Sequence, residues 1–264
     1  MNESDLAGQP VDDGGRVGAP SAPVAAATLF GDRLALAERY ADHLADTGIS
    51  HGLIGPREVP RVWERHILNC AVITEVMAEG SSVVDIGSGA GLPGLCIALA
   101  RPDLDVTLVE PMERRTTWLE AVVADLGLRN VSVRRARAEE LHGHLVSDVV
   151  TARAVAPLEK LARLCLPLVR PGGRLVAMKG SSAEREIEEA MTVLRRLQAS
   201  DARVRTCGGE VLEAPTTIVV VDKSQSAPSA LSERLPGLQR GRGAEGERPS
   251  RARHRRPRRA RGTA

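Results

Sequence analysis

Apolar residues follow two different periods along the chain, and the change between them divides it into two parts. From Asp32 to Thr47 and from Arg57 to Met77, apolar positions recur every three or four residues, which is typical of amphipathic helices. From Ser81 onward, short runs rich in valine and isoleucine alternate with helical stretches, which predicts parallel strands joined by helices. The expected strands lie at 83–84, 106–109, 131–133, 149–150, 175–178 and 218–221, with a further strand within 203–212 whose hairpin would make the sheet mixed.

This pattern predicts an α/β fold: a Rossmann-like, seven-stranded, mostly parallel sheet with helices on both faces, preceded by N-terminal helices. Four segments follow from it. We expect a disordered stretch over 1–27, an N-terminal helical region over 28–80, the sheet domain over 81–223 and a disordered, arginine-rich tail over 224–264. The two end segments are rich in Gly, Pro, Ser and charged residues without any hydrophobic period, so they cannot bury enough apolar surface to fold.

Charge and cysteine content narrow the classes of function. The net charge of +2 hides an asymmetry, because residues 240–264 carry ten arginines and two glutamates, which leaves the remainder at −6. Such a tail can bind RNA without sequence preference, and the alternative is drift in composition at the end of an arginine-rich, lysine-poor chain. No apolar run approaches the roughly 18 residues of a membrane span and no basic leader precedes one, so we expect a cytoplasmic protein without a membrane partner. The four scattered cysteines and isolated histidines predict no metal site.

The segment from Asp85 to Gly94 has the pattern of a nucleotide-binding loop. Its glycines allow a tight turn between a strand and a helix, and they let the backbone approach a ligand closely. Gly89-x-Gly91-x-x-Gly94 and the acid Glu110 after the next strand suit either a nicotinamide nucleotide or S-adenosylmethionine (AdoMet), whose ribose hydroxyls Glu110 would accept. Asp85, before the first glycine, favours the cationic AdoMet over a pyrophosphate. A turn that merely connects strand and helix is less favoured, because extra glycines cost stability.

Together with the turn Pro171-Gly172-Gly173, the loop and the acid resemble the class I AdoMet-dependent methyltransferases. Within that class the chain resembles the RsmG family, also called GidB, from about Leu53 to Lys223. The resemblance rests on Arg65-His66-Ile67-Leu68-Asn69, on Asp85-Ile86-Gly87-Ser88-Gly89-Ala90-Gly91-Leu92-Pro93-Gly94, on Ser147-Asp148-Val149-Val150-Thr151-Ala152-Arg153-Ala154 and on Met178-Lys179-Gly180. The family usually has Asp at the position of Asn69.

The resemblance implies an enzyme that methylates guanine N7 in 16S ribosomal RNA, with residues 81–223 as its AdoMet-binding methyltransferase domain. Its partner would be the small ribosomal subunit, its RNA or an assembly intermediate. The expected cofactor-binding residues are Asp85, Gly87, Gly89, Gly91, Leu92, Glu110, Ala138, Glu139 and Arg153. We expect Arg153 and Lys179 to be the catalytic residues, which hold guanine O6 or nearby phosphates. N7 is already nucleophilic and loses no proton, so alignment with the methyl group suffices.

Alternative acceptors fit the sequence less well. Amine methylation usually goes with a Pro-Pro-aromatic loop after the fourth strand, where this chain has Thr151 to Pro157. Methylation of a pyrimidine carbon needs a nucleophilic cysteine near the cofactor, and no Pro-Cys occurs. Two other classes of function remain as alternatives. They are a nicotinamide-dependent oxidoreductase and a non-catalytic RNA-binding protein with the same fold.

The few aromatic residues limit how RNA can be held. The chain has two Trp, one Tyr and one Phe, so base stacking cannot be its main grip. The residues Arg57, Arg61, Arg65 and His66 lie on or near one helix and are candidates for phosphate contacts, although a solvated helix face is the alternative. We expect the protein to act as a monomer.

Overall fold

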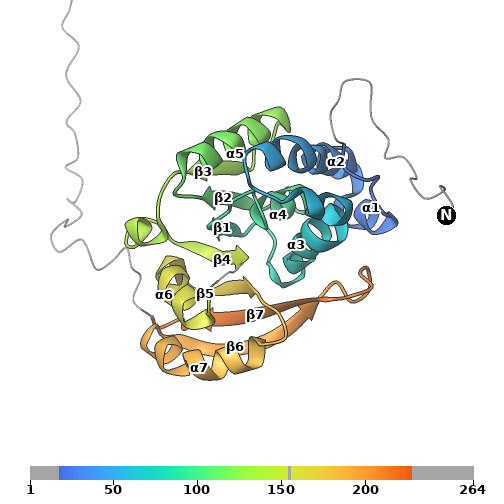
Figure 1. Ribbon diagram of the computed structural model, residues 1–264. Helices are drawn as coiled ribbons and strands as arrows, with labels where there is room; N and C mark the ends of the chain where they lie inside the picture. Colours follow the sequence, from blue (N-terminus) through green and yellow to red (C-terminus); the bar gives the residue numbers. More distant parts are fainter. Residues whose placement is uncertain (1–17, 154–155, 228–264) are drawn as a thin grey trace, which may run out of the picture. The chain divides into compact units, whose positions relative to one another are not determined.

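Seven strands form one sheet in the computed structural model, which describes residues 18–153 and 156–227 (Figure 1). The strand order is β3-β2-β1-β4-β5-β7-β6. The strands are β1 (Ser82–Ile86), β2 (Asp105–Val109), β3 (Val131–Arg134), β4 (Ser147–Arg153), β5 (Val169–Met178), β6 (Ala199–Cys207) and β7 (Thr216–Lys223). Strands β1 to β5 pair in parallel, and β7 is antiparallel to both β5 and β6. The predicted mixed sheet of seven strands is therefore confirmed.

Helices precede the sheet and connect its strands. The N-terminal region contains α1 (Val24–Phe30), η1 (Gly31–Arg33), α2 (Leu34–His43), η2 (Leu44–Gly48), η3 (Pro56–Arg61), η4 (Val62–Leu68), α3 (Asn69–Ala71) and η5 (Val72–Val76), where η marks 3₁₀ or π turns. The connections between strands contain α4 (Gly94–Ala100), α5 (Glu113–Asp125), η6 (Ala138–Leu141), α6 (Leu158–Cys165), η7 (Leu166–Leu168) and α7 (Ala183–Arg196). Both N-terminal helical segments lie where they were predicted, but the second is irregular. Pro60 lies inside η3, where its ring and missing N–H prevent a regular α-helix.

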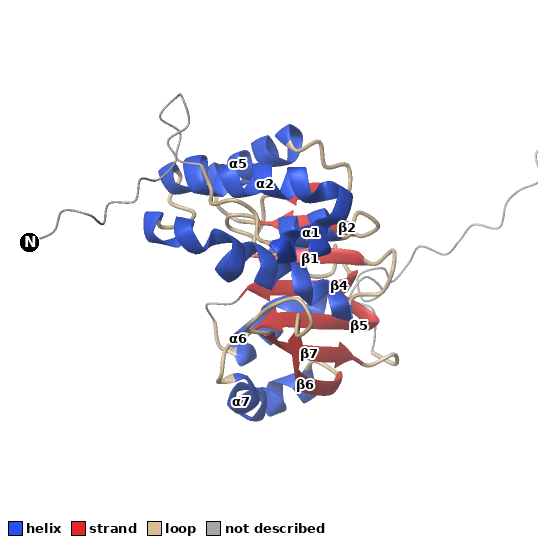
Figure 2. Cartoon of the chain, turned by 90° about the vertical axis from the view of Figure 1, so that its right-hand side faces the viewer, coloured by secondary structure: helices blue, strands red, loops and turns tan. Residues whose placement is uncertain are grey.

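The two faces of the sheet bury two separate hydrophobic clusters. Neighbouring strand residues such as Val83 and Val84 belong to opposite clusters, because successive side chains of a strand point to opposite faces. One cluster joins the N-terminal helices, α4 and α5 to the sheet, and the other joins α6 and α7 to it. Figure 2 shows helices on both sides of the strands. The expectation of a sheet covered on both faces is confirmed.

Some predicted boundaries need correction. The expected disorder over 1–27 does not hold for residues 18–27, because α1 begins at Val24 and its Ala26 is fully buried. Before that helix, Ala19 N donates to Asp42 Oδ1 over 3.0 Å, and the Pro20 carbonyl accepts from Trp63 Nε1 over 2.8 Å. Long-range contacts to α2 and η4 thus order a segment that has no hydrophobic period of its own. The remainder of 1–27 lies outside the described residues.

The last strands also differ from the prediction. The strand expected within 203–212 is β6, which spans 199–207. The described structure extends through Ala227, which is buried, beyond the limit of 223 expected for the sheet domain. The turn predicted at Pro171-Gly172-Gly173 lies within β5, where the register against β4 shifts. Gly173 is needed there because a Cβ atom would lie 2.5 Å from the Asp148 carbonyl oxygen of the neighbouring strand. The rest of the predicted tail lies outside the described residues.

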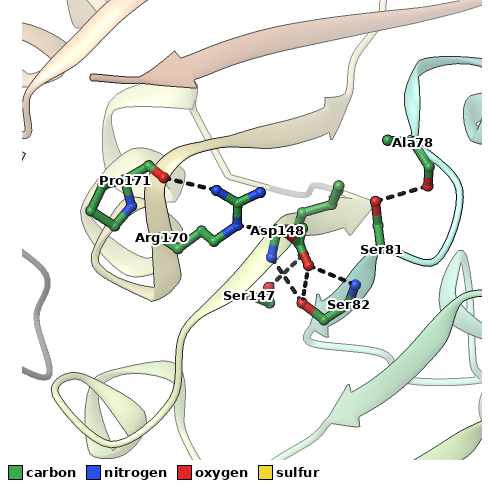
Figure 3. A network of polar contacts seen from close by, with 8 residues as sticks. Ala78, Ser81, Ser82, Ser147, Asp148, Arg170 and Pro171 are labelled. Atoms are coloured by element: carbon green, nitrogen blue, oxygen red, sulfur yellow. Dashed lines mark hydrogen bonds and ion pairs between the residues drawn. The ribbon is translucent and has the colours of Figure 1, made fainter. Parts of the chain in front are cut away.

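Asp148, at the start of β4, contacts the amino-terminal ends of the two neighbouring strands, β1 and β5 (Figure 3). Its Oδ2 accepts from the backbone N–H of Ser82 over 2.8 Å and from the Ser82 hydroxyl, and its Oδ1 accepts from Arg170 Nε. Ser82 begins β1, and Arg170 lies at the start of β5. Burial opposes ionisation of Asp148, but the Ser82 and Arg170 contacts outweigh it and lower the pKa of the carboxyl. This network fixes the strands at the edge opposite to the site described below.

Cysteine, metal and membrane features complete the description. All four cysteines have free thiols and are buried. Among residues 18–153 and 156–227, no group of three or more His, Cys, Asp or Glu side chains is placed to hold a metal ion. No helix in that part of the chain has the length and apolar character required to cross a membrane.

Candidate functional site

The predicted site residues follow the carboxyl ends of five neighbouring strands. Asp85 is in β1, Glu110 follows β2, Ala138 comes after β3, Arg153 ends β4 and Lys179 follows β5. Because these strands are parallel, their carboxyl ends meet at one edge of the sheet, which is where ligands bind in open α/β sheets. Topology thus gathers residues that are nearly one hundred positions apart in the sequence.

Glu110 is hydrogen-bonded to the backbone of the glycine loop. Its Oε2 accepts from the backbone N–H of Gly89 over 3.1 Å, and its Oε1 accepts from that of Met112 over 3.0 Å. Gly87 and Gly89 have φ values of +72° and +56°, a region where residues with side chains are strained. The carboxylate is nearly fully buried, with Arg115 at 3.7 Å from Oε2. Since each carboxylate oxygen has two lone pairs, Glu110 keeps acceptor capacity beyond these two bonds.

Asp85 lies beneath the start of α4, with no exposed surface. Its Oδ2 accepts from the backbone N–H of Gly94 over 3.0 Å, while its Oδ1 has no hydrogen-bond partner within the described part of the chain. Burial raises the pKa of Asp85 to about 7, against the hydrogen bond from Gly94 and with a further rise from the charge of Glu110. A Cβ at Gly94 would lie 2.2 Å from Leu108 Cδ2, so only glycine allows the helix this close to β2. The carboxylate predicted to face the cofactor is therefore placed behind the loop.

The N-terminal helices contribute a contact that the sequence did not indicate. The hydroxyl of Tyr40, on α2, donates to the carbonyl oxygen of Ala90 in the glycine loop over 2.7 Å. Tyr40 has no exposed surface, and burial raises the pKa of its phenol well above the usual value. Leu92, in the same loop, is also buried. A lone tyrosine on an apolar helix face looks like an ordinary core residue, so no signal in the sequence could have identified its contact with the loop.

The segment after β3 places its two predicted residues differently. Ala138 is buried, whereas Glu139 is exposed at the start of η6. The neighbouring Glu140 caps this turn, since its Oε2 accepts from the backbone N–H of Arg137 over 2.8 Å. Glu139 forms no side-chain hydrogen bond or ion pair with the described residues, and its exposed carboxylate could face a ligand at the edge of the sheet.

A cavity of about 910 Å³ lies at the ends of β4 and β5. Four cations line it, Arg153, Lys179, Arg65 and Arg185, together with two acids, Glu186 and Glu189, which pair with Lys179 and Arg185. Asn69 also lines it, and the Oδ1 of this amide accepts from the Thr216 hydroxyl over 3.0 Å. The structure thus brings the two predicted catalytic residues to one cavity, and of its cations Arg153 and Arg65 are not paired with the acids that line it.

Lys179 is less available to a ligand than the sequence suggested. Its side chain is 4% exposed, and its Nζ lies 2.6 Å from both the Ala156 carbonyl oxygen and Glu186 Oε2. Glu186 also accepts from the backbone N–H of Leu158, over 2.8 Å, and from the Ser182 hydroxyl. The Lys179 and Glu186 pair therefore ties the connection between β4 and α6 to the start of α7.

His66 was grouped with three arginines as a candidate for RNA contacts, but the structure places it apart from them. Arg57, Arg61 and Arg65 are exposed, whereas His66 is 7% exposed and contacts Arg153. Arg61 and Arg65 line a second groove, of about 520 Å³, which shares Arg65 and Asn69 with the larger cavity. Two of the three predicted arginines thus lie along one continuous surface beside the cavity.

The residues at the glycine loop are compatible with AdoMet. Gly87 is exposed, and nothing lies within 4 Å of where its Cβ would be, so the backbone there is open to a nucleoside. Glu110 would offer acceptors to a ribose, and Asp85 has a buried oxygen without a hydrogen-bond partner among the described residues, whose charge would favour a cationic ligand. A pyrophosphate would meet two acids at this loop, which disfavours a nicotinamide nucleotide.

Comparison with known proteins also points to a methyltransferase that binds AdoMet. The family model for rRNA small subunit methyltransferase G matches residues 33–214. Proteins named ribosomal RNA small subunit methyltransferase G are similar to this chain. The relative from Pseudarthrobacter chlorophenolicus is 57% identical over 203 residues, which cover 76% of this chain and 94% of the relative. The relative from Thermobifida fusca is 52% identical over 226 residues, which cover 83% of this chain and 95% of the relative.

A solved structure supports the fold. It is described as an S-adenosylmethionine-dependent methyltransferase from Methanococcus maripaludis, and it aligns with a TM-score of 0.50 and 14% identity over 71% of this chain and 93% of that one. At that identity the likeness shows the Rossmann-like fold alone. The matches in sequence carry the assignment, because they extend over most of this chain and nearly all of each relative. The chain belongs to the rRNA small subunit methyltransferase G family, whose members are AdoMet-dependent methyltransferases.

Proposed function

We propose that this protein transfers the methyl group of AdoMet to N7 of a guanine in 16S ribosomal RNA, acting as a monomer in the cytoplasm. The observation that carries the proposal is the cavity at the ends of β4 and β5, where Arg153 lies beside the expected cofactor edge. Guanine presents N7 and O6 as neighbouring acceptors, and an arginine is the usual donor to such an edge. Arg153 would bind O6 and so orient N7 toward the methyl group.

Alignment is the main source of catalysis in this proposal. Bound AdoMet supplies an electrophilic methyl group, and N7 attacks it with a lone pair that carries no proton. The chain therefore needs no general base, only a dry cavity and a fixed guanine. All four cysteines are buried, which agrees with an acceptor that requires no nucleophilic thiol.

The cofactor contacts come from the edge of the sheet. The exposed backbone at Gly87, the turn through Gly89, Gly91 and Leu92, and the carboxylate of Glu110 would hold the nucleoside and its ribose. Ala138 and Glu139 would hold the adenine, with Glu139 accepting from its amino group. Asp85 would act through its charge from behind the loop.

The two predicted catalytic residues have different roles in this proposal. Arg153 contacts the substrate, whereas Lys179 anchors the connection between β4 and α6 through Ala156 and Glu186. Arg61 and Arg65, along the adjoining groove, would hold RNA phosphates. The predicted RNA contacts from the tail, residues 240–264, lie outside the described part of the chain and stay a prediction.

One experiment tests the reaction and its acceptor. Small subunits from cells that lack this protein are incubated with the purified protein and isotope-labelled AdoMet, and the digested RNA is analysed by mass spectrometry. The label is expected in 7-methylguanosine, and Arg153→Ala is expected to reduce transfer at least tenfold. Label in another nucleoside would refute the acceptor, and binding of RNA and AdoMet without transfer would indicate a non-catalytic RNA-binding protein.

A further inference from the structure

His66 links the N-terminal region to the proposed substrate-binding arginine. It lies on η4, and its Nδ1 is 2.5 Å from Nη2 of Arg153 at the end of β4. These two residues are 87 positions apart in the sequence. Nη1 of Arg153 also lies 3.8 Å from Cys70 Sγ, so the guanidinium contacts the N-terminal region through both of its terminal nitrogens. Arg153 also lines the cavity.

The chemistry of the partners fixes which nitrogen of His66 carries the proton. A guanidinium is always protonated and can only donate, so Nδ1 must accept. On the other side of the ring, Nε2 lies 2.9 Å from Glu58 Oε2, and a carboxylate can only accept, so Nε2 must donate. His66 is therefore neutral with its hydrogen on Nε2, which agrees with a pKa lowered by burial and by the charge of Arg153.

Glu58 is itself held in place. Its Oε2 also lies 3.2 Å from Nε of Arg65, and its side chain is 30% exposed. The charged and titratable groups that face His66 are thus Glu58, Arg65 and Arg153, with the thiol of Cys70 close to Arg153. The chain of contacts from Glu58 through His66 to Arg153 removes freedom from a long side chain that would otherwise sample many rotamers.

We propose that His66 and Glu58 are positioning residues, which hold the guanidinium of Arg153 in the orientation that receives the target guanine. The inference rests on the proposed function of Arg153. It assigns the N-terminal helical region a part in catalysis, because η3 and η4 supply both residues. Among the described residues, Glu110 and the glycine loop form no hydrogen bond with His66 or Arg153, so the contacts that the loop and Glu110 would make with AdoMet are expected to survive the loss of this support.

The test compares substitutions that keep or remove the two hydrogen bonds of His66. His66→Leu removes both and is expected to lower kcat at least tenfold, with the Kd for AdoMet changed by less than twofold. His66→Gln keeps an acceptor and a donor and is expected to recover much of that loss. Glu58→Ala is expected to lower kcat by less than His66→Leu, because Arg153 keeps its acceptor. His43→Gln, at the α2 ion pair with Asp125, is the matched control with unchanged activity.

Two further readouts separate positioning from a merely structural role. Protonation of His66 removes the Nδ1 lone pair and places a second positive charge beside Arg153, so kcat of the wild type is expected to fall at acidic pH. The fall is expected on the acidic side of the ordinary histidine range, because burial and the charge of Arg153 lower the pKa of His66. His66→Gln should lose this acidic limb. In an Arg153→Ala background, His66→Leu should cause no further loss, because the two residues act as one unit.

The outcomes distinguish failure of the inference from failure of the proposed function. Full activity of Arg153→Ala would remove Arg153 from the site and with it the proposed function of that residue. A strongly impaired Arg153→Ala together with a fully active His66→Leu would overturn this inference alone. Additive losses in the double variant, or an unchanged acidic limb in His66→Gln, would also overturn it.

Discussion

At the scale of single residues, Glu110 carries the strongest prediction for cofactor binding. Its carboxylate accepts from Gly89 and Met112, so it shapes the loop, and in the proposed site it would also accept from the ribose hydroxyls. Glu110→Ala is expected to weaken AdoMet binding at least tenfold, measured by calorimetry, because both functions are lost. Glu113→Ala is the matched control, since Glu113 is an exposed acid three residues away, paired with Arg135. Equal affinities of the two variants would exclude Glu110 from the cofactor site.

Asp85 gives the protein a pH-dependent stability. Its pKa is about 7 in the folded protein because of burial, above the value near 3.8 expected in the unfolded chain, so the folded form keeps a proton that the unfolded form has lost. The stabilising effect of this proton is fully present below pH 3.8 and is lost as the pH rises through about 7.

The Asp85→Asn variant isolates this effect. An asparagine can still accept from the Gly94 N–H but does not titrate. In urea unfolding without cofactor, the wild type is expected to lose about 1 kcal/mol relative to Asp85→Asn between pH 6 and pH 8. A constant difference between the two proteins over that range would show that Asp85 does not titrate there.

At the scale of elements, the pair of Lys179 and Glu186 determines how β5 meets α7. Lys179→Met leaves the Glu186 carboxylate without its partner, and the loss of one member of a largely buried pair is expected to cost about 3 kcal/mol of unfolding free energy. The double variant Lys179→Met with Glu186→Met should recover most of that stability. Lys160→Met, on the exposed face of α6, is the control. If Lys179 instead contacts RNA, Lys179→Met would retain its stability and lose methyl transfer.

At the scale of the whole molecule, the N-terminal segment completes one of the two hydrophobic clusters. A protein that begins at residue 28 lacks the buried Ala26 and the bonds from Ala19 to Asp42 and from Trp63 to Pro20. It is expected to be about 2 kcal/mol less stable than one that begins at residue 18, measured by urea unfolding, because two hydrogen bonds and a packed residue are lost. Equal stabilities would place the start of the folded domain at residue 28, as the sequence pattern suggested.

The sequence was most informative where one residue type is required by local geometry. The period of apolar residues identified the strands and helices, since burial on one face or two forces that period on any sequence. The glycines from Gly87 to Gly94 identified the loop because the backbone there needs positive φ or the close approach of β2 to α4. Glu110 was predicted from its place after a strand, where the parallel topology brings side chains to one edge, whereas Arg153 was predicted from the resemblance to the family.

The sequence by itself thus determined the fold class, the mixed seven-stranded sheet and the position of the glycine loop, because these depend on local period and on connections that all parallel sheets share. Only the tertiary structure decided which charges are free. It paired Lys179 with Glu186, turned Asp85 away behind α4, and brought Tyr40 and His66 against the site from helices far away in the chain. Such contacts join elements at long sequence separation, and their energy depends on burial and partner geometry, which no local pattern encodes.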